Sequence, residues 1–291
     1  MPPSPSTPTY PSSSELPLLA RIVRQLRWTE TSFSFLAGFG MIILLIMYFW
    51  WPLAVDVLHQ IDWNGQWWLS FDWLLLGDFV VMTLLLMGGA DWKRDSLIIL
   101  VGAVGGLVIE SWGTQTHIWT YYTLERPPLW IIPAWPIASL SIDRIVRILG
   151  EALPRASRLW PVLYWLIFPA FLALMLFFVW PTIAKPMTLA AIALCVTLIL
   201  SPKDHRMMLL TFAAGAGLGY FLELWGTTRL CWTYYTHETP PLFAVLAHGM
   251  AAVAFWRSGL LVPMVLGRLS SFVPQLAALP WLPKAESEDQ I

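Results

Sequence analysis

Long apolar runs separated by short polar segments dominate this chain. Eight runs approach the roughly 20 residues that a helix needs to cross a bilayer; they cover residues 33–55, 73–90, 96–112, 129–148, 160–181, 186–201, 207–225 and 242–262. The runs near 96 and 186 are short, and the fourth contains Pro133 and Pro136, so seven or nine spans are alternatives. The pattern predicts an all-α, polytopic integral membrane protein with about eight transmembrane helices.

The composition indicates the same class. Hydrophobic residues make up 57% of the chain and charged residues only 12%, whereas a typical soluble domain is about 25% charged. The net charge of −1 gives no indication of a nucleic-acid partner. Cys195 lies in a predicted helix and Cys231 in a predicted outer loop, so no disulfide is expected.

The chain repeats itself at a constant spacing of 113 residues. Residues 110–129 read ESWGTQTHIWTYYTLERPPL and match residues 223–242, ELWGTTRLCWTYYTHETPPL, at thirteen of twenty positions. Each copy contains four predicted spans, and an even number keeps both copies in the same orientation. We therefore expect two parallel four-helix repeats, residues 33–148 and 149–264, packed side by side about an axis along the membrane normal.

The basic residues predict the orientation. Fourteen Lys and Arg residues fall on the side that holds both termini, and only Arg126, Lys185 and Arg229 fall on the other. Because short basic loops stay in the cytoplasm, both termini, including residues 265–291, should be cytoplasmic in a cell inner (plasma) membrane. Residues 1–32 are predicted to form a disordered Pro/Ser-rich tail and then an amphipathic basic helix on an anionic membrane surface, or else an ordinary basic flank.

Glycine and glutamate share a stripe of the third predicted helix and the matching stripe of the seventh, at Gly102, Gly106, Glu110, Gly215, Gly219 and Glu223. The four-residue spacing places each stripe on one helix face. Glycine at this spacing lets another helix approach closely inside a bilayer. We expect the repeats to meet through these stripes, with both glutamates facing protein. The alternative is that each glutamate reaches water at the outer end of its helix.

Asp78 and His248 are predicted to lie at a depth similar to that of the glutamates. At the repeat spacing Asp78 corresponds to Ala191 and His248 to Trp135, so a site that contains them is asymmetric. No basic residue lies near Asp78 in the sequence, and ionisable groups inside a membrane usually have a function; an isolated histidine is also common as a satisfied core residue. The predicted catalytic residues are Glu110, Glu223, Asp78 and His248.

The aromatic and hydroxyl residues of the repeated motif are the predicted substrate-binding residues: Trp112, Thr114, Trp119, Tyr121, Tyr122, Trp225, Thr227, Trp232, Tyr234 and Tyr235. Tryptophan and tyrosine also anchor helices at bilayer interfaces, which is the alternative interpretation. The four predicted catalytic residues lack the spacing of a recognised metal site, and no nucleotide-binding or zinc-protease motif is present. No metal is predicted, and any cofactor stays unassigned.

One copy of the motif resembles a known family. The string GLVIESWGTQT, with Tyr121, Pro133 and Trp135, is similar to the E-x-x-G-T-x-T, Tyr, Pro-and-Trp pattern of the membrane-bound carotenoid biosynthesis family that includes carotenoid hydratases. The match covers about thirty residues, with a weaker echo from Gly219 to Pro241. His117 stands where that pattern has glycine. The matching positions are Glu110, Gly113, Thr114, Thr116, Tyr121, Pro133 and Trp135.

The resemblance implies an all-helical membrane enzyme that adds water across a terminal isoprenoid double bond. Glu110 or Glu223 would then protonate the alkene, the aromatic faces would stabilise the carbocation, and Asp78 or His248 would orient or deprotonate water. The expected partner is a membrane lipid or isoprenoid, and no oligomeric state is predicted. A proton-coupled transporter or lipid carrier is the competing class, and a structural membrane subunit is the third.

Overall fold

The computed structural model describes residues 17–282 apart from 62, 64, 71, 271, 274 and 276–278. The predicted disordered tail and the last nine residues lie outside this part of the chain. The described residues form an all-α fold in which six helices are long and apolar enough to cross a membrane: α2 (Glu30–Phe49), α6 (Trp92–Thr116), α7 with its preceding turn (Leu129–Ala152), α8 (Leu159–Phe178), α10 (His205–Thr228) and α11 (Leu242–Leu269). Two shorter apolar helices are α5 (Trp73–Met87) and α9 (Pro186–Leu200).

Several predicted helix boundaries were wrong. Helix α2 ends at Phe49 and not near residue 55, and α11 continues to Leu269 and does not end near 262. The third helix is not short, because α6 begins at Trp92 behind the N-cap Asp91 and continues through the repeated motif to Thr116. The fourth begins later than residue 129. A 3-10 turn, η1 (Leu129–Ile131), comes first, and α7 proper is Ala134–Ala152 with Pro133 at its N-cap. Proline lacks the N–H that a helix interior needs, so it suits this first turn.

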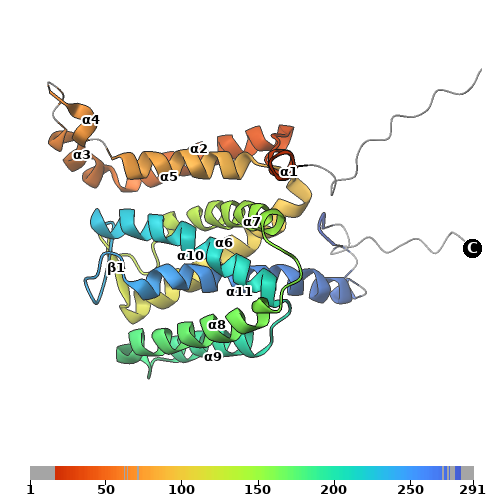
Figure 1. Ribbon diagram of the computed structural model, residues 1–291. Coiled ribbons are helices and arrows are strands. Elements are labelled where there is room, and N and C mark those ends of the chain that lie inside the picture. The colour runs from red at the N-terminus through yellow and green to blue at the C-terminus, as the bar shows by residue number, and fades with distance from the viewer. Residues whose placement is uncertain are drawn as a thin grey trace, which may run out of the picture.

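The helices pack in layers (Figure 1). Helices α2 and α5 contact each other on one side of the bundle, and α8 and α9 contact each other on the opposite side. Between them α10 packs against α11 and α7, and α6 packs against α7 and α11. Two short helices, α3 (Trp51–Gln60) and α4 (Trp67–Ser70), connect α2 to α5.

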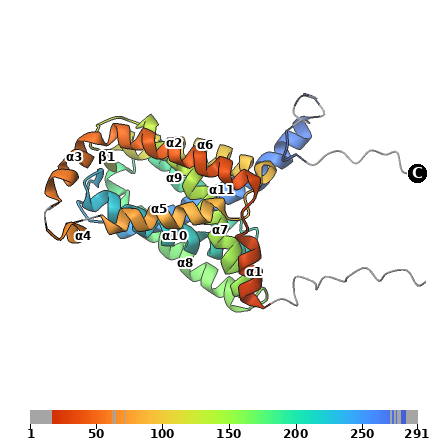
Figure 2. The ribbon, with the colours of Figure 1, turned by 90° about the horizontal axis from the view of Figure 1, so that it is seen from above.

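Helix α1 (Leu18–Gln25) is the predicted amphipathic basic helix, and none of its residues is buried. It lies crosswise to α2 and α5 at one end of the bundle, as Figures 1 and 2 show from two directions. The Arg21 guanidinium pairs with the Glu151 carboxylate at the end of α7, so this end of the bundle holds α1 in place.

A two-stranded sheet, which the sequence analysis did not predict, joins the two motif copies at the other end. Strand β1 (Trp119–Tyr121) pairs antiparallel with β2 (Trp232–Tyr234), and Thr120 lies opposite Thr233. These two threonines are equivalent at the 113-residue spacing. The equivalent positions His117 and Leu230 turn the chain out of α6 and α10 with φ of 63° and 56°.

The expectation that the repeats meet through their glycine stripes was wrong. A Cβ atom on Gly106 would lie 2.3 Å from the Trp135 ring, and one on Gly219 would lie 2.5 Å from His248. Each stripe therefore packs against the next helix of its own copy, α7 or α11. Helices that follow each other through a short connection are usually neighbours in space, so α7 and α11 occupy these close-approach grooves.

Candidate functional site

Glu110 is buried and accepts three side-chain hydrogen bonds. Its exposed fraction is 3%. The Trp119 indole donates to Oε2 at 3.1 Å, and the Tyr121 hydroxyl donates to Oε1 at 3.0 Å. The Trp135 indole, from the start of α7, also donates to Oε1 at 3.1 Å. A buried carboxylate is tolerated only when it is paired or well hydrogen-bonded, and these three donors meet that requirement.

Glu223 occupies the equivalent place in the second copy, also with an exposed fraction of 3%. The Trp232 indole donates to its Oε2 at 2.9 Å, and the Tyr234 hydroxyl donates to its Oε1 at 2.8 Å. The third neighbour is His248 of α11, whose Nδ1 lies 3.6 Å from Oε1. That distance is too long for a good hydrogen bond, so Glu223 accepts two side-chain hydrogen bonds where Glu110 accepts three.

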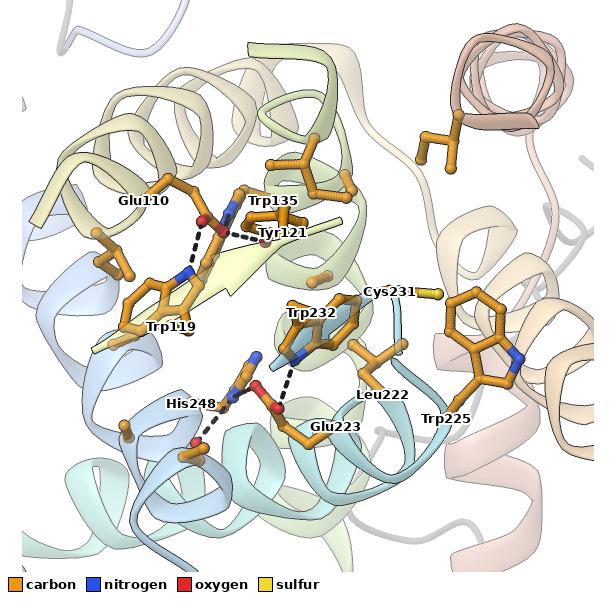
Figure 3. A pocket seen from close by; sticks show the side chains of 18 of the residues that line it. Glu110, Trp119, Tyr121, Trp135, Leu222, Glu223, Trp225, Cys231, Trp232 and His248 are labelled. Carbon is orange, nitrogen blue, oxygen red and sulfur yellow. Dashed lines mark hydrogen bonds and ion pairs between the residues drawn. The ribbon is translucent and has the colours of Figure 1, made fainter. Parts of the chain in front are cut away.

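Trp135 and His248 occupy equivalent positions and stack on each other where the two copies meet. Their ring centroids are 5.9 Å apart and the rings are nearly parallel, at 9°. Figure 3 shows the two glutamates approaching this region from separate helices, each with its own tryptophan donor. Tyr121 also contacts Trp232, and Trp119 contacts Tyr234, each with centroids 5.8 Å apart. The two carboxylates thus belong to one site.

His248 has a defined proton on one nitrogen. Its Nδ1 lies 3.0 Å from the Ala244 carbonyl oxygen. A carbonyl oxygen can only accept, so Nδ1 must carry the hydrogen. The same Nδ1 faces Glu223, as the dashed lines in Figure 3 show. With the hydrogen on Nδ1, Nε2 is the accepting nitrogen of the neutral ring.

The local sequence explains how each glutamate obtains its donors. The chain leaves α6 at His117 and returns as β1, so alternate strand residues Trp119 and Tyr121 point the same way. Gly113 makes room for this return, since a Cβ atom there would lie 1.9 Å from the Trp119 ring. Gly226 does the same beneath Trp232, at 2.0 Å. In each copy the glycine thus makes room for the tryptophan, and the tryptophan and tyrosine donate hydrogen bonds to the glutamate.

Four of the predicted substrate-binding residues do not line the cavity described below. The hydroxyls of Thr114 and Thr227 are buried and donate to the carbonyls of Glu110 and Glu223 one turn earlier. The Tyr122 hydroxyl donates to the Phe49 carbonyl at the end of α2, and the Tyr235 hydroxyl donates to the Phe178 carbonyl of α8 at 2.6 Å. These hydroxyl groups bond the motif to the helices, and their contact with substrate stays a prediction.

Trp112 and Trp225 do line the cavity, and each indole also bridges to a helix start. The Trp112 indole donates to Thr188 at 3.1 Å. The Trp225 indole donates to Asp72, the N-cap of α5, at 2.9 Å. Asp72 also pairs with Arg229 at 3.0 Å. Asp72 was not among the predicted site residues. Its place before an apolar run signals a helix cap, but nothing in the sequence indicates the contacts with residues more than 150 positions away.

A large apolar cavity of about 1120 Å³ opens beside the two glutamates. Its polar lining includes both glutamates, His248, Asp78 and Asp72, and its aromatic lining includes Trp119, Tyr121, Trp135, Trp232 and Tyr234. Ligand pockets usually measure about 300–1,000 Å³, so this one suits a large apolar molecule. The structure therefore gathers all four predicted catalytic residues around one cavity, and it adds Trp135, which was noted only for its resemblance and its counterpart.

Asp78 does not share the hydrogen-bond donors that surround Glu110 and Glu223. It lies on α5, lines the cavity and is partly exposed, and its counterpart Ala191 also lines the cavity. Within the described part of the chain, neither a hydrogen bond nor an ion pair joins it to another side chain. Asp78 is thus an open carboxyl group facing an apolar space, whereas Glu110 and Glu223 are held by donors.

Burial controls the protonation of the loop residues around the site. It raises the pKa of Tyr121 and Tyr234 well above the usual value of 10.0. Both phenols therefore keep their protons and act as donors to the glutamates. Burial also raises the pKa of the Cys231 thiol to about 12. Cys231 and Cys195 are both free thiols, so neither forms a disulfide.

The site shows no arrangement of metal ligands. Among the residues that the structure describes, no three histidine, cysteine, aspartate or glutamate side chains group together as metal ligands would. No protein-family model, curated protein or solved structure matches this chain. The function is therefore inferred from the cavity and from the hydrogen bonds around Glu110 and Glu223.

Proposed function

We propose that the chain is a multi-pass inner-membrane protein with eight spans, formed by the six long helices and by α5 and α9. The two spans of only 15 residues each would be short for a bilayer of average thickness. We further propose two parallel repeats with both termini in the cytoplasm. The pairing of β1 with β2 supports this arrangement, because it holds both motif copies at the same end of the bundle.

We propose that this protein is a membrane-embedded enzyme that adds water to a carbon–carbon double bond of an isoprenoid chain. The single observation that carries the proposal is the joint occurrence of a large apolar cavity, two buried carboxyl groups and the five aromatic side chains around them in one place. An apolar chain would be bound by burial of its surface. The resemblance of residues 106–135 to the carotenoid hydratase pattern supports the same reaction class.

Glu223 is the proposed proton donor. Its carboxyl group transfers a proton to the less substituted alkene carbon, and a tertiary cation forms on the other carbon. The aromatic faces that line the cavity stabilise this cation. Water then forms the new carbon–oxygen bond, and its surplus proton passes to Nε2 of His248. The proton on Nδ1, the nitrogen 3.6 Å from Glu223 Oε1, moves to the Glu223 carboxylate, and exchange with water restores the starting form of the ring. The atoms balance as one water added, and Asp78 is proposed to position that water.

We propose that Glu110, with the three donors around it, positions other side chains and does not itself transfer a proton. Its three donors are a tyrosine hydroxyl and two indoles, and an indole cannot exchange a proton at ordinary pH. A carboxylate fixed in this way would hold Trp135 in place, and Trp135 in turn stacks on His248. Glu110 would thus act on the reaction through the orientation of His248.

Turnover in heavy-oxygen water tests the proposal. The purified protein would be incubated with an acyclic polyprenoid that has a terminal isopropylidene group, and mass spectrometry would detect incorporation of one labelled water. The matched control is Glu223→Gln, which keeps the size of the side chain but cannot donate the same proton. A folded protein that binds the polyprenoid and never incorporates label would refute the hydratase.

A lipid carrier or proton-coupled transporter is the second candidate. The observation that favours it is the position of the cavity, which residues of both motif copies line. Transporter sites often lie at the interface between repeats. A carrier would retain its ligand unchanged, so lipid extraction from the purified protein distinguishes the two: unaltered polyprenoid that exchanges between vesicles supports the carrier, and a hydroxylated product supports the enzyme.

A further inference from the structure

Four arginines line a second cavity. It lies beside α1, which is at the end of the bundle opposite the two strands (Figure 1). This cavity measures about 480 Å³, and its arginines are Arg24, Arg27, Arg94 and Arg147. The only carboxylate among its described lining residues is Asp91, whose Oδ1 already accepts the backbone N–H of Lys93 at 2.9 Å. The cavity therefore has a clear excess of positive charge.

Two of these arginines are available to a ligand. Arg94 contacts Asp95 at 3.3 Å, and Arg147 pairs with Asp143. Arg24 and Arg27 are exposed, and neither forms an ion pair with any residue in the described part of the chain. Thr31 also lines the cavity, in the first turn of α2, where free backbone N–H groups favour an anion.

The backbone fixes the arginines in this arrangement. Gly89 has φ of 56°, and a Cβ atom there would lie 2.5 Å from the Gln25 carbonyl oxygen. The Gly89 N–H donates to the Arg27 carbonyl at 3.0 Å, and the Thr29 hydroxyl donates to the Ala90 carbonyl at 2.9 Å. The end of α1 is thus held against the turn between α5 and α6, so the cavity is a defined part of the fold.

The cavity is specific to the first copy. At the repeat spacing Arg94 corresponds to Met207 and Arg147 to Leu260, and α1 precedes the first copy alone. The cavity therefore does not follow from the duplicated scaffold, and it shares no residue with the isoprenoid site.

The surroundings indicate a lipid headgroup as the ligand. Apolar side chains of α1 are exposed, with Leu19 at 73% and Val23 at 61%. Trp28 and Trp92, at 49% and 58% exposed, lie beside the arginines in the sequence, and tryptophan is enriched where acyl chains meet headgroups. Basic pockets of this kind between membrane helices suit lipid phosphates.

We propose that the cavity formed by Arg24, Arg27, Arg94 and Arg147 binds the phosphate headgroup of an anionic glycerophospholipid. The guanidinium groups would hydrogen-bond the phosphate oxygens, for which their planar shape is suited. The exposed apolar side of α1 would contact the acyl chains of the same leaflet. This proposal is independent of the reaction at the duplicated glutamates.

The test uses the full-length protein in a mild detergent. Short-chain phosphatidylglycerol, short-chain phosphatidylcholine and inorganic phosphate would each be titrated, and binding would be measured by native mass spectrometry and thermal stabilisation. The test variant is Arg24→Gln with Arg27→Gln. The matched control is Arg155→Gln with Arg158→Gln, because these two arginines are also exposed and their loss changes the net charge equally.

We expect the parent protein to bind phosphatidylglycerol in preference to both other probes. The test variant should lose about 30-fold in affinity, given the contribution of each basic residue near a lipid surface, and the control should change little. Arg24→Lys with Arg27→Lys should retain most of the binding. Increasing salt should weaken binding to the parent protein, which gives a measurement that needs no variant.

Three results would overturn the proposal. Equal loss in the test and control variants would show general surface electrostatics. Equal binding of phosphatidylcholine would show that the negative charge is not recognised. Binding of inorganic phosphate as tight as that of phosphatidylglycerol would show a site for a free anion.

Discussion

The surroundings of Glu110 and Glu223 contain the same donors from the neighbouring strand and differ in one side chain. Glu110 and Glu223 each receive an indole and a phenol from the strand that follows, and each lies above a glycine that makes room for the indole. The third neighbour is Trp135 for Glu110 and His248 for Glu223. A tryptophan there completes a fixed set of donors, whereas a histidine adds a group that can take up a proton.

This difference shows how a duplicated scaffold can acquire an asymmetric site. The tryptophan and the tyrosine that each strand donates to its carboxylate are present in both copies. The residues that differ, Trp135 and His248, stack on each other at the junction, so one copy can position a side chain of the other. A chemical role for one glutamate thus does not require the same role for its counterpart.

The largest expected effect comes from exchanging each glutamate for glutamine. Glu223→Gln should lower turnover by about 100-fold or more, because general acid catalysis commonly contributes that much. Glu110→Gln should lower turnover less but should lower the melting temperature. Glutamine has one accepting oxygen, so at least one of three donors loses its partner, at a cost of about 1–3 kcal/mol.

Turnover per folded protein and thermal melting, measured on both variants, provide the comparison. Equal losses of turnover would contradict the division of roles. Loss of turnover in Glu110→Gln alone would reverse it.

A second test gives both copies the same residue at the position occupied by Trp135 and His248. His248→Trp should keep the fold, because Gly219 leaves space in the same way that Gly106 does for Trp135. Turnover should fall by about tenfold or more, since the indole cannot relay a proton. The reverse change, Trp135→His, should retain more turnover. Steady-state kinetics on both variants check this, and an active His248→Trp protein would remove His248 from the mechanism.

A third test compares the two glycines that pack against the tryptophan rings. Gly113→Ala and Gly226→Ala should each destabilise the protein by about 1–3 kcal/mol, since the new methyl group overlaps the tryptophan ring. The control is Gly217→Ala, where a Cβ atom meets nothing within 4 Å. Melting in detergent measures all three. Similar melting of the control and either test variant would show that the rings move aside easily.

The smallest effect on turnover is expected at a position where the copies differ but neither residue has a proposed role in the reaction. Cys231 corresponds to Ile118, and both side chains are buried. Cys231→Val should keep turnover and change stability by less than about 1.5 kcal/mol, because valine is nearer to cysteine in volume than isoleucine is and volume-conserving core exchanges usually cost no more. In the parent protein Cys231 should resist alkylation at pH 8, because its pKa of about 12 keeps the thiol protonated. Rapid alkylation would show that the loop opens.

Sequence patterns located most of the fold and the central residues of the site. Every predicted apolar run corresponds to a helix in the structure, because long apolar segments must satisfy their backbone polar groups internally. The repeat identified Glu110 and Glu223 and the aromatic residues around them. The sequence did not distinguish residues that bond the carboxylates, such as Tyr121, from residues that bond a helix end, such as Tyr122, although the two are adjacent.

The sequence by itself determined the helices, the duplication and the identity of the two buried acids, because hydropathy and repetition are local properties of the chain. Only the tertiary structure decided which partners each acid receives, which helix each glycine stripe faces and where a cavity opens. Those properties depend on the direction of side chains from distant segments. Trp135, His248 and Asp72 acquire their roles through such contacts, and no local pattern encodes the distances that define them.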